Sequence, residues 1–145
     1  MALTVTSQLM KNVRDYFLSV GEVGLKSVFR GRPSSLPALP CARLHHEDRA
    51  IGLEYNLYNW DTSVVLQLMS ETQDELDELE FKLLDQLKKD SQDITETLSD
   101  EIVGVYNFEI GGIREDIFVE SPEEEGRFFV VRSVVFGVSY YSIGE

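Results

Sequence analysis

The sequence of 145 residues contains one cysteine, Cys41, so no internal disulfide can form. Chains that depend on disulfides belong to oxidising compartments, and this composition fits a reducing one. No basic or histidine-rich spacing around Cys41 indicates a thiolate with a lowered pKa. We therefore expect this side chain to be a small, buried hydrophobe.

Long apolar runs are also absent. No stretch reaches the roughly 18 apolar residues of a membrane span, and the first residues lack the apolar stretch of a signal peptide. We expect a soluble, intracellular protein with no membrane partner.

Catalytic and nucleotide-binding motifs are missing as well. The sequence has no GxxxxGK[ST], GxGxxG, GxSxG or HExxH pattern. The paired carboxylates at 115–116 and 123–125 lie at predicted turns, where solvated charge is their ordinary role. We expect no catalytic residues, no cofactor and no enzymatic activity.

The one cluster of metal-ligand residue types is His45 and His46 beside Glu47 and Asp48. Adjacent residues of a strand point to opposite faces, so both imidazoles reach one ion only in a turn. No cysteine pair and no remote third histidine completes a zinc site. We predict a polar loop here and no bound metal.

Positive charge is scarce, because 13 Lys and Arg stand against 26 Asp and Glu for a formal net charge of −13. Binding to duplex DNA without sequence preference needs basic groups that displace counterions from phosphates, so this composition argues against it. The charge is uneven: residues 1–50 carry seven Lys and Arg against four Asp and Glu, whereas residues 71–101 carry three against twelve. Head-to-tail contact between copies would use this asymmetry, and solubility also explains much of it.

The chain otherwise has a globular composition, with 43% hydrophobic residues, and its length suits one domain over residues 1–145. Apolar residues at three- and four-residue steps predict a first helix that starts at a Thr6 or Ser7 cap and ends before Gly21. A second helix is predicted over 72–89, because Thr72 and Glu75 have the spacing of a capping box. The apolar stripes are Leu9, Val13, Tyr16, Phe17 and Val20 in the first helix and Leu76, Leu79, Leu83 and Leu87 in the second.

The remaining segments alternate as strands do. We predict a short strand near 27–30, an extended proline-rich loop at 31–40, and β-structure at 41–45 and across 50–69 with a turn at Asn59 and Asp61. A polar loop at 90–100 precedes strands at 102–110, 114–120 and 127–143, with a turn at 111–112 and a hairpin loop at 121–126. The order predicts an α+β fold: a mostly antiparallel sheet with an N-terminal helix and one long central helix packed against it.

The last predicted strand is unusual because it is apolar on both faces. A helix explains one covered face, and the other face needs the first helix or another copy of the chain. Arg132 interrupts the apolar pattern, where an unpaired guanidinium would cost several kcal/mol. It either reaches solvent or a carboxylate of its own chain, or meets a carboxylate of a neighbouring subunit, such as one on the 74–80 helix face. The two faces hold Phe128, Val130, Val134, Phe136, Val138 and Tyr140, and Phe129, Val131, Val135 and Tyr141.

A group of aromatic residues, Tyr55, Tyr58 and Trp60, lies near the predicted turn at 59–61. Core packing is the first interpretation of these three side chains, and a subunit contact is the second.

The layout of the whole chain resembles the tail terminator, or tail completion, proteins of tailed bacteriophages, the lambda-type neck family. The similar features are the first helix, the loop "RPSSLPALP", the segments "IGLEYNLYNW" and "TSVVLQLMS", the helix "TQDELDELEFKLLDQLKK" and the closing strands through "FFVVRSVVFGVSYY". The likeness covers nearly all of the chain and is one of order, length and pattern, since that family has no catalytic signature.

The resemblance implies a structural virion protein that is assembled in the host cytoplasm and located in the neck. It would form a ring with copies of itself, usually a hexamer, on the head-proximal end of the tail tube. The ring would stop polymerisation of the tail tube protein and join the tail to the head connector or adaptor. DNA would pass through without specific binding. Under this reading Tyr55, Tyr58, Trp60 and Arg132 are candidate subunit contacts, and Glu123, Glu124 and Glu125 are candidates for lumen lining or docking.

The alternative class is an acidic, non-catalytic binding module. Such a protein would be a small regulator, or an inhibitor that mimics DNA and fills a basic cleft with its carboxylates. A small hydrolase is a third class, for which the sequence offers no constellation of residues.

Overall fold

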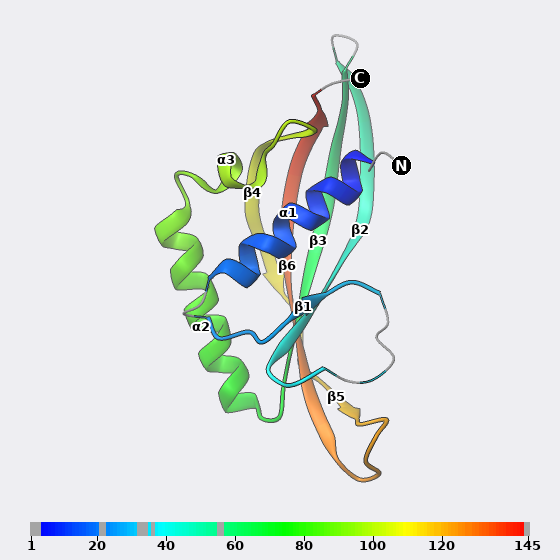
Figure 1. Cartoon of the computed structure of the whole chain (residues 1–145), viewed down its shortest axis with the longest axis vertical. Coiled ribbons are helices and arrows are strands. Elements are labelled where there is room, and N and C mark those ends of the chain that lie inside the picture. The colour runs from blue at the N-terminus through cyan, green and yellow to red at the C-terminus, as the bar shows by residue number, and fades with distance from the viewer. Residues whose placement is uncertain (1–3, 21–22, 32–34, 36, 55–56, 144–145) are drawn as a thin grey trace.

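The computed structural model describes residues 4–20, 23–31, 35, 37–54 and 57–143, with the side chains of 48–54 and 57–58 outside that description. Within these residues, three helices cover one face of a six-stranded sheet (Figure 1). This arrangement confirms the predicted α+β class. In chain order the elements are α1 (Val5–Ser19), β1 (Val28–Phe29), β2 (Cys41–Glu54), β3 (Leu57–Ser70), α2 (Gln73–Asp90), α3 (Ile94–Leu98), β4 (Val103–Ile113), β5 (Ile117–Glu120) and β6 (Phe128–Ser142).

Helix α1 begins two residues earlier than the sequence indicates. Thr4 is the N-cap, and its hydroxyl accepts a hydrogen bond from the Ser7 backbone N–H at 3.1 Å. Of the two predicted caps, Ser7 lies inside the helix, and Thr6 is buried with its hydroxyl 3.0 Å from the Tyr140 hydroxyl. The prediction was wrong because a tertiary partner engages this hydroxyl.

Helix α2 follows the sequence prediction closely. Thr72 is the N-cap and accepts a hydrogen bond from the Glu75 backbone N–H at 3.2 Å. The Glu75 carboxylate does not close the capping box but accepts from the Ser70 hydroxyl. Acidic residues in the first turn and Lys88 and Lys89 in the last complement the helix dipole. Local sequence signals therefore suffice to place this helix.

The polar segment at 90–100 is not a plain loop, because it contains the short helix α3. Ile94 and Leu98 of this helix are buried, and they close the core beside α1. Among the described residues, no helix is long and apolar enough to cross a membrane.

The sheet has the strand order β1-β2-β3-β6-β4, with β5 also paired to β6. All pairings are antiparallel except the one between β1 and β2. β4 pairs with residues 134–142 of β6 and β5 with residues 128–131, so the two strands follow each other along the same side of β6. β6 is thus paired on both sides along most of its length.

Two predicted turns lie inside strands. Asn59 pairs with Tyr141 and Asp61 pairs with Ser139, so both residues belong to β3. The Asp61 carboxylate accepts a 2.6 Å hydrogen bond from the Ser139 hydroxyl, which satisfies it within the sheet. The expected turn at 111–112 is a register shift within β4 between Ile110 and Gly112. The 121–126 hairpin loop between β5 and β6 is confirmed.

Two apolar clusters explain how β6 is covered. The larger cluster joins the helices to even-numbered positions of β2, β3 and β6, including Leu66, Phe136 and Tyr140. The smaller cluster lies on the other face and contains Phe129 and Val131 of β6. The helix α1 therefore does not cover the second face. At Phe129 and Val131 this face packs against residues of β1, β2, β3 and β5 and against Leu39. The smaller cluster consists of Cys41, Met69, Phe129 and Val131 with Phe29, Leu39 and Val119.

Candidate interaction surfaces

Arg132 is held by three carboxylates of its own chain. Its Nε and Nη2 atoms donate to the two carboxylate oxygens of Asp116 at 2.7 and 2.8 Å, and Nη1 donates to Asp77 at 2.7 Å and Glu80 at 3.1 Å. Asp77 and Glu80 lie on α2, and Asp116 lies between β4 and β5. The intrachain alternative for Arg132 is therefore the one that the structure shows. Its guanidinium needs no carboxylate from a second copy, and a role in subunit contact stays a prediction.

Within this cluster Arg132 and Asp116 are mostly shielded from water, with side chains 11% and 12% exposed, whereas Asp77 and Glu80 are 67% and 27% exposed. Hydrogen bonds from the Arg132 guanidinium hold the pKa of Asp116 below its ordinary value, against the opposing effect of burial. The Gln73 amide also donates to Asp116 at 3.0 Å. The cluster thus fixes the start of α2 to the sheet and to the β4–β5 connection.

Of the three candidate aromatic contacts, the structure describes one side chain. Trp60 is half-buried and stacks on Tyr140, with ring centroids 5.6 Å apart and an interplanar angle of 13°. Core packing therefore accounts for Trp60. Tyr55 and the side chain of Tyr58 lie outside the described residues, and their role stays a prediction.

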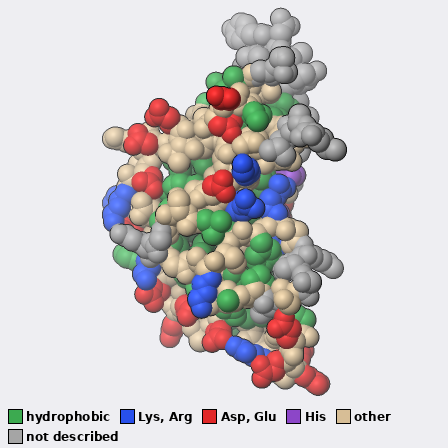
Figure 2. Space-filling view, in the orientation of Figure 1, with side chains coloured by type: hydrophobic (Ala, Val, Ile, Leu, Met, Phe, Trp, Pro, Cys, Tyr) green, Lys and Arg blue, Asp and Glu red, His purple; other side chains and the backbone are tan. Residues whose placement is uncertain are grey.

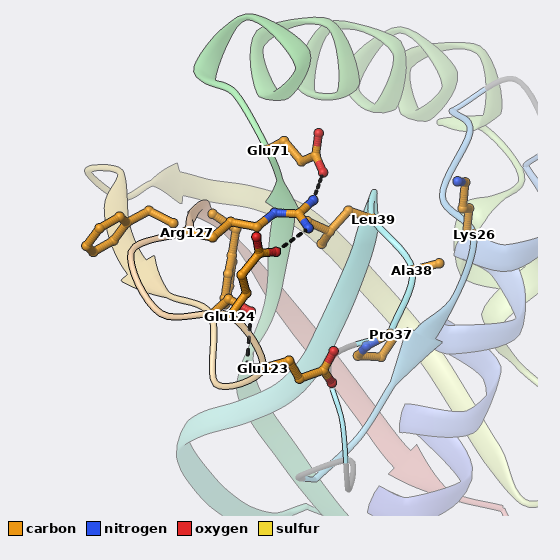
Figure 3. A pocket seen from close by; sticks show the side chains of 11 residues that line it. Lys26, Pro37, Ala38, Leu39, Glu71, Glu123, Glu124 and Arg127 are labelled. Atoms are coloured by element: carbon orange, nitrogen blue, oxygen red, sulfur yellow. Dashed lines mark hydrogen bonds and ion pairs between the residues drawn. The ribbon is translucent and has the colours of Figure 1, made fainter.

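The predicted acidic loop forms one wall of a cleft of about 510 Å³ (Figure 3). Glu123, Glu124 and Glu125 are all exposed. Arg127 contacts Glu124 at 3.1 Å and also pairs with Glu71, so part of this negative charge is compensated. The opposite wall comes from Lys26 and the 37–39 segment. The cleft is a mixed-charge surface.

A feature that the sequence interpretation missed is the exposed apolar surface on β4 and β5. Ile110 and Phe118 are 48% and 59% exposed, on strands that each pair with β6 alone. The sequence pattern predicts uncovered apolar residues on β6, but the central residues of β6 are buried in the two apolar clusters. The signal was present in the alternation of "YNFEIGGI" and "IFVE", but the sequence does not show which strands lie at the edge. The exposed apolar residues of these strands are Tyr106, Ile110, Ile113, Ile117 and Phe118.

An apolar hollow of about 230 Å³ adjoins this surface. It lies where the end of α2 approaches α3 and β4, with Leu84 and Leu87 on one side and Phe108 and Ile110 on the other. The volume is below the roughly 300–1,000 Å³ of pockets that enclose small ligands. The hollow is therefore too small to enclose a typical small ligand.

The histidine pair lies in β2, and not in the predicted loop. His45 pairs with Val65 and His46 with Val64, because the neighbouring strand extends far enough to continue the ladder. Burial lowers the pKa of His45, with Glu47 opposing that shift. In the described part of the chain, no group of three or more His, Cys, Asp or Glu side chains is placed to hold a metal ion.

Comparison with solved structures shows a likeness in fold. No protein-family model and no curated protein matches the sequence. The fold is similar to that of a chain in a structure described as the virion of a native gene transfer agent particle. The TM-score is 0.58 at 12% sequence identity, and the alignment covers 97% of this chain and 99% of the other. At this identity the likeness establishes a shared fold.

Proposed function

We propose that this protein is a structural virion component that forms a ring at the head-proximal end of a phage tail tube. The ring would end tube polymerisation and provide the joint to the head connector. The observation that carries the proposal is the fold shared with a virion chain over nearly the whole of both molecules. The sequence resemblance to tail terminators, which covers the same length, supports the finer assignment.

The exposed surfaces support assembly over a monomeric role. β4 and β5 present Ile110, Ile117 and Phe118 to solvent on strands with one paired side. Natural monomers protect strand edges, and contiguous exposed apolar patches mark interaction sites. A subunit that repeats such a contact around an axis closes into a ring, and a hexamer is the ring size that the family resemblance implies.

The acidic character suits a conduit for DNA. With a net charge of −13, a ring of copies would present many carboxylates to its lumen, and carboxylates repel the phosphates of passing DNA. The exposed loop with Glu123, Glu124 and Glu125 is our candidate for lumen lining or for docking to the adjacent tube ring. Replacement of all three by Ser should alter tail length, head joining or DNA delivery, and normal values of all three would remove this assignment.

The proposed role is geometric and involves no chemical reaction. Its partners are copies of the chain, the tail tube protein and the head connector, and its place is the neck of the virion after assembly in the host cytoplasm. No catalytic residue and no cofactor is required for any of these contacts.

The test is to add the purified protein to the polymerising tube protein of the same virion. We expect tubes of reduced length that each carry one ring at one end in electron micrographs. The ring mass should be a multiple of the subunit mass by light scattering. Unchanged tube lengths with no protein bound at tube ends would refute the proposal.

A further inference from the structure

The two lateral edges of the sheet are both open. In the described residues, β4 pairs only with β6, and the outer side of β2 is paired by β1 only at Ala42 and Arg43. Unpaired backbone N–H and C=O groups on such edges are available to another chain. One copy therefore offers two different surfaces, at opposite ends of the strand order.

The first surface, the basic edge, consists of Lys26, Arg30 and Arg43 around β1 and the start of β2. Lys26 and Arg30 are exposed, and neither has an ion-pair partner among the described residues. On the face drawn in Figure 2, Lys and Arg side chains gather over α1 and toward β2.

The second surface, the acidic edge, lies on α2 and β4. It consists of Leu84, Glu109 and Ile110, which line the apolar hollow, and of Asp85, which is exposed on α2 and pairs with Lys89 at 3.2 Å. α2 carries seven Asp and Glu against three Lys. Glu109 is exposed at the rim of the hollow, while Lys88 is the one cation among the residues that line it. This edge therefore combines negative charge with a dent for an apolar side chain.

We propose that copies of the chain join head to tail, with the acidic edge of one copy against the basic edge of the next. Opposite charges attract across this contact, whereas two acidic or two basic edges repel each other, which disfavours a symmetric dimer. A contact between two different surfaces repeats from copy to copy and closes into a ring when the rotation allows it. This inference rests on the proposed ring function and identifies the surfaces that would build it.

The irregular pairing of β4 limits how far the strand of another copy could pair with its backbone. Register shifts between Val105 and Asn107 and between Ile110 and Gly112 interrupt the strand. Such bulges prevent a long, uninterrupted backbone ladder with another strand. Side-chain charge and the apolar hollow therefore determine the partner, and salt should weaken the contact as the Debye length falls from about 10 Å at 0.1 M to about 3 Å at 1 M.

The test is a charge-swap experiment on the full chain. One variant reverses the basic edge (K26E/R30E), and a second reverses the acidic edge (D85K/E109K), which leaves the Arg132 cluster intact. A third variant combines all four substitutions. The control D15K/E101K adds the same positive charge as the second variant, at exposed residues that belong to neither of the two surfaces. Each protein is checked for folding by circular dichroism. Light scattering then gives the mass of the protein by itself and after mixing with assembled tail tubes.

We expect the wild type and the control to assemble, each reversal to lower the assembled fraction at least tenfold, and the combined variant to regain it. If both reversals assemble like the wild type, or if the combined variant stays monomeric, the assigned edges are wrong while the ring function stands. If the wild type itself forms no assembly either alone or with tube ends, the proposed function fails and this inference fails with it.

Discussion

Replacing Arg132 with Met tests whether one guanidinium fastens α2 to the sheet. The substitution keeps an apolar stem of similar length but leaves Asp116, Asp77 and Glu80 close together without their shared cation. Removing one partner of a buried ion pair costs roughly 3–5 kcal/mol. Asp77 is 67% exposed and can turn to solvent, so the lower end of that range applies. We expect the free energy of unfolding to fall by about 3 kcal/mol.

The assay is urea unfolding at pH 7, with a thermal scan in which the variant should lose roughly 10 °C in Tm. The double variant R132M/D116N is the control, because it removes one of the stranded charges. It should recover part of the loss, about 1 kcal/mol. A variant R132M within about 0.5 kcal/mol of the wild type would refute the reasoning, since ordinary surface changes have effects of that size.

The same experiment has a pH signature. The pKa of Asp116 lies below its ordinary value of 3.8 in the folded protein, so its contribution to stability is fully present above that value. The contribution is lost as the pH falls through the folded-state pKa. The wild type should therefore exceed R132M by a constant margin above about pH 5, and the margin should shrink as the pH falls below 3.8. A margin that grows with acidity would contradict the assignment.

Three further predictions concern local features. Thr72→Ala removes the N-cap of α2 and should cost about 1 kcal/mol in urea unfolding, and an unchanged midpoint would exclude a capping role. Tyr140→Phe removes the hydroxyl between Thr6 and Thr62, all three residues being buried, and should cost about 2 kcal/mol. A Tyr140→Phe variant with an unfolding free energy equal to or above that of the wild type would contradict this role of the hydroxyl. Burial raises the pKa of Cys41 to about 11, so a thiol reagent at pH 8 should label this residue only after unfolding, and rapid labelling of native protein would be inconsistent with the structure.

The elements that the sequence predicts well are those with local causes. α2 has an N-cap at the residue before it, and its own 18 residues contain a charge gradient and an apolar stripe. Asn59 and Asp61 favour turns locally, but pairing with Tyr141 and Ser139 keeps them in β3. α3 escaped prediction because two apolar residues in a polar segment give no periodicity, although both are buried.

The candidate surfaces also differ in whether their cause is local in the sequence or depends on contacts between distant residues. The sequence indicates that Arg132 needs a carboxylate and that the 74–80 helix face is a source, but residue order does not say whether that helix belongs to the same copy. The structure answers this with Asp77 and Glu80 of the same chain. The exposed edge of β4 depends on strand order, which is set by long-range pairing and has no local signature.

The division of the apolar residues into two clusters has a thermodynamic consequence. The smaller cluster shares no member with the larger one and is built from Cys41, Met69, Phe129 and Val131 on the opposite face of the sheet. A region held by few apolar contacts opens at a lower free energy than the global transition. We therefore expect the β5–β6 hairpin to open locally at a lower free energy than the rest of the sheet, so its amide protons should exchange with deuterium before those beneath the helices.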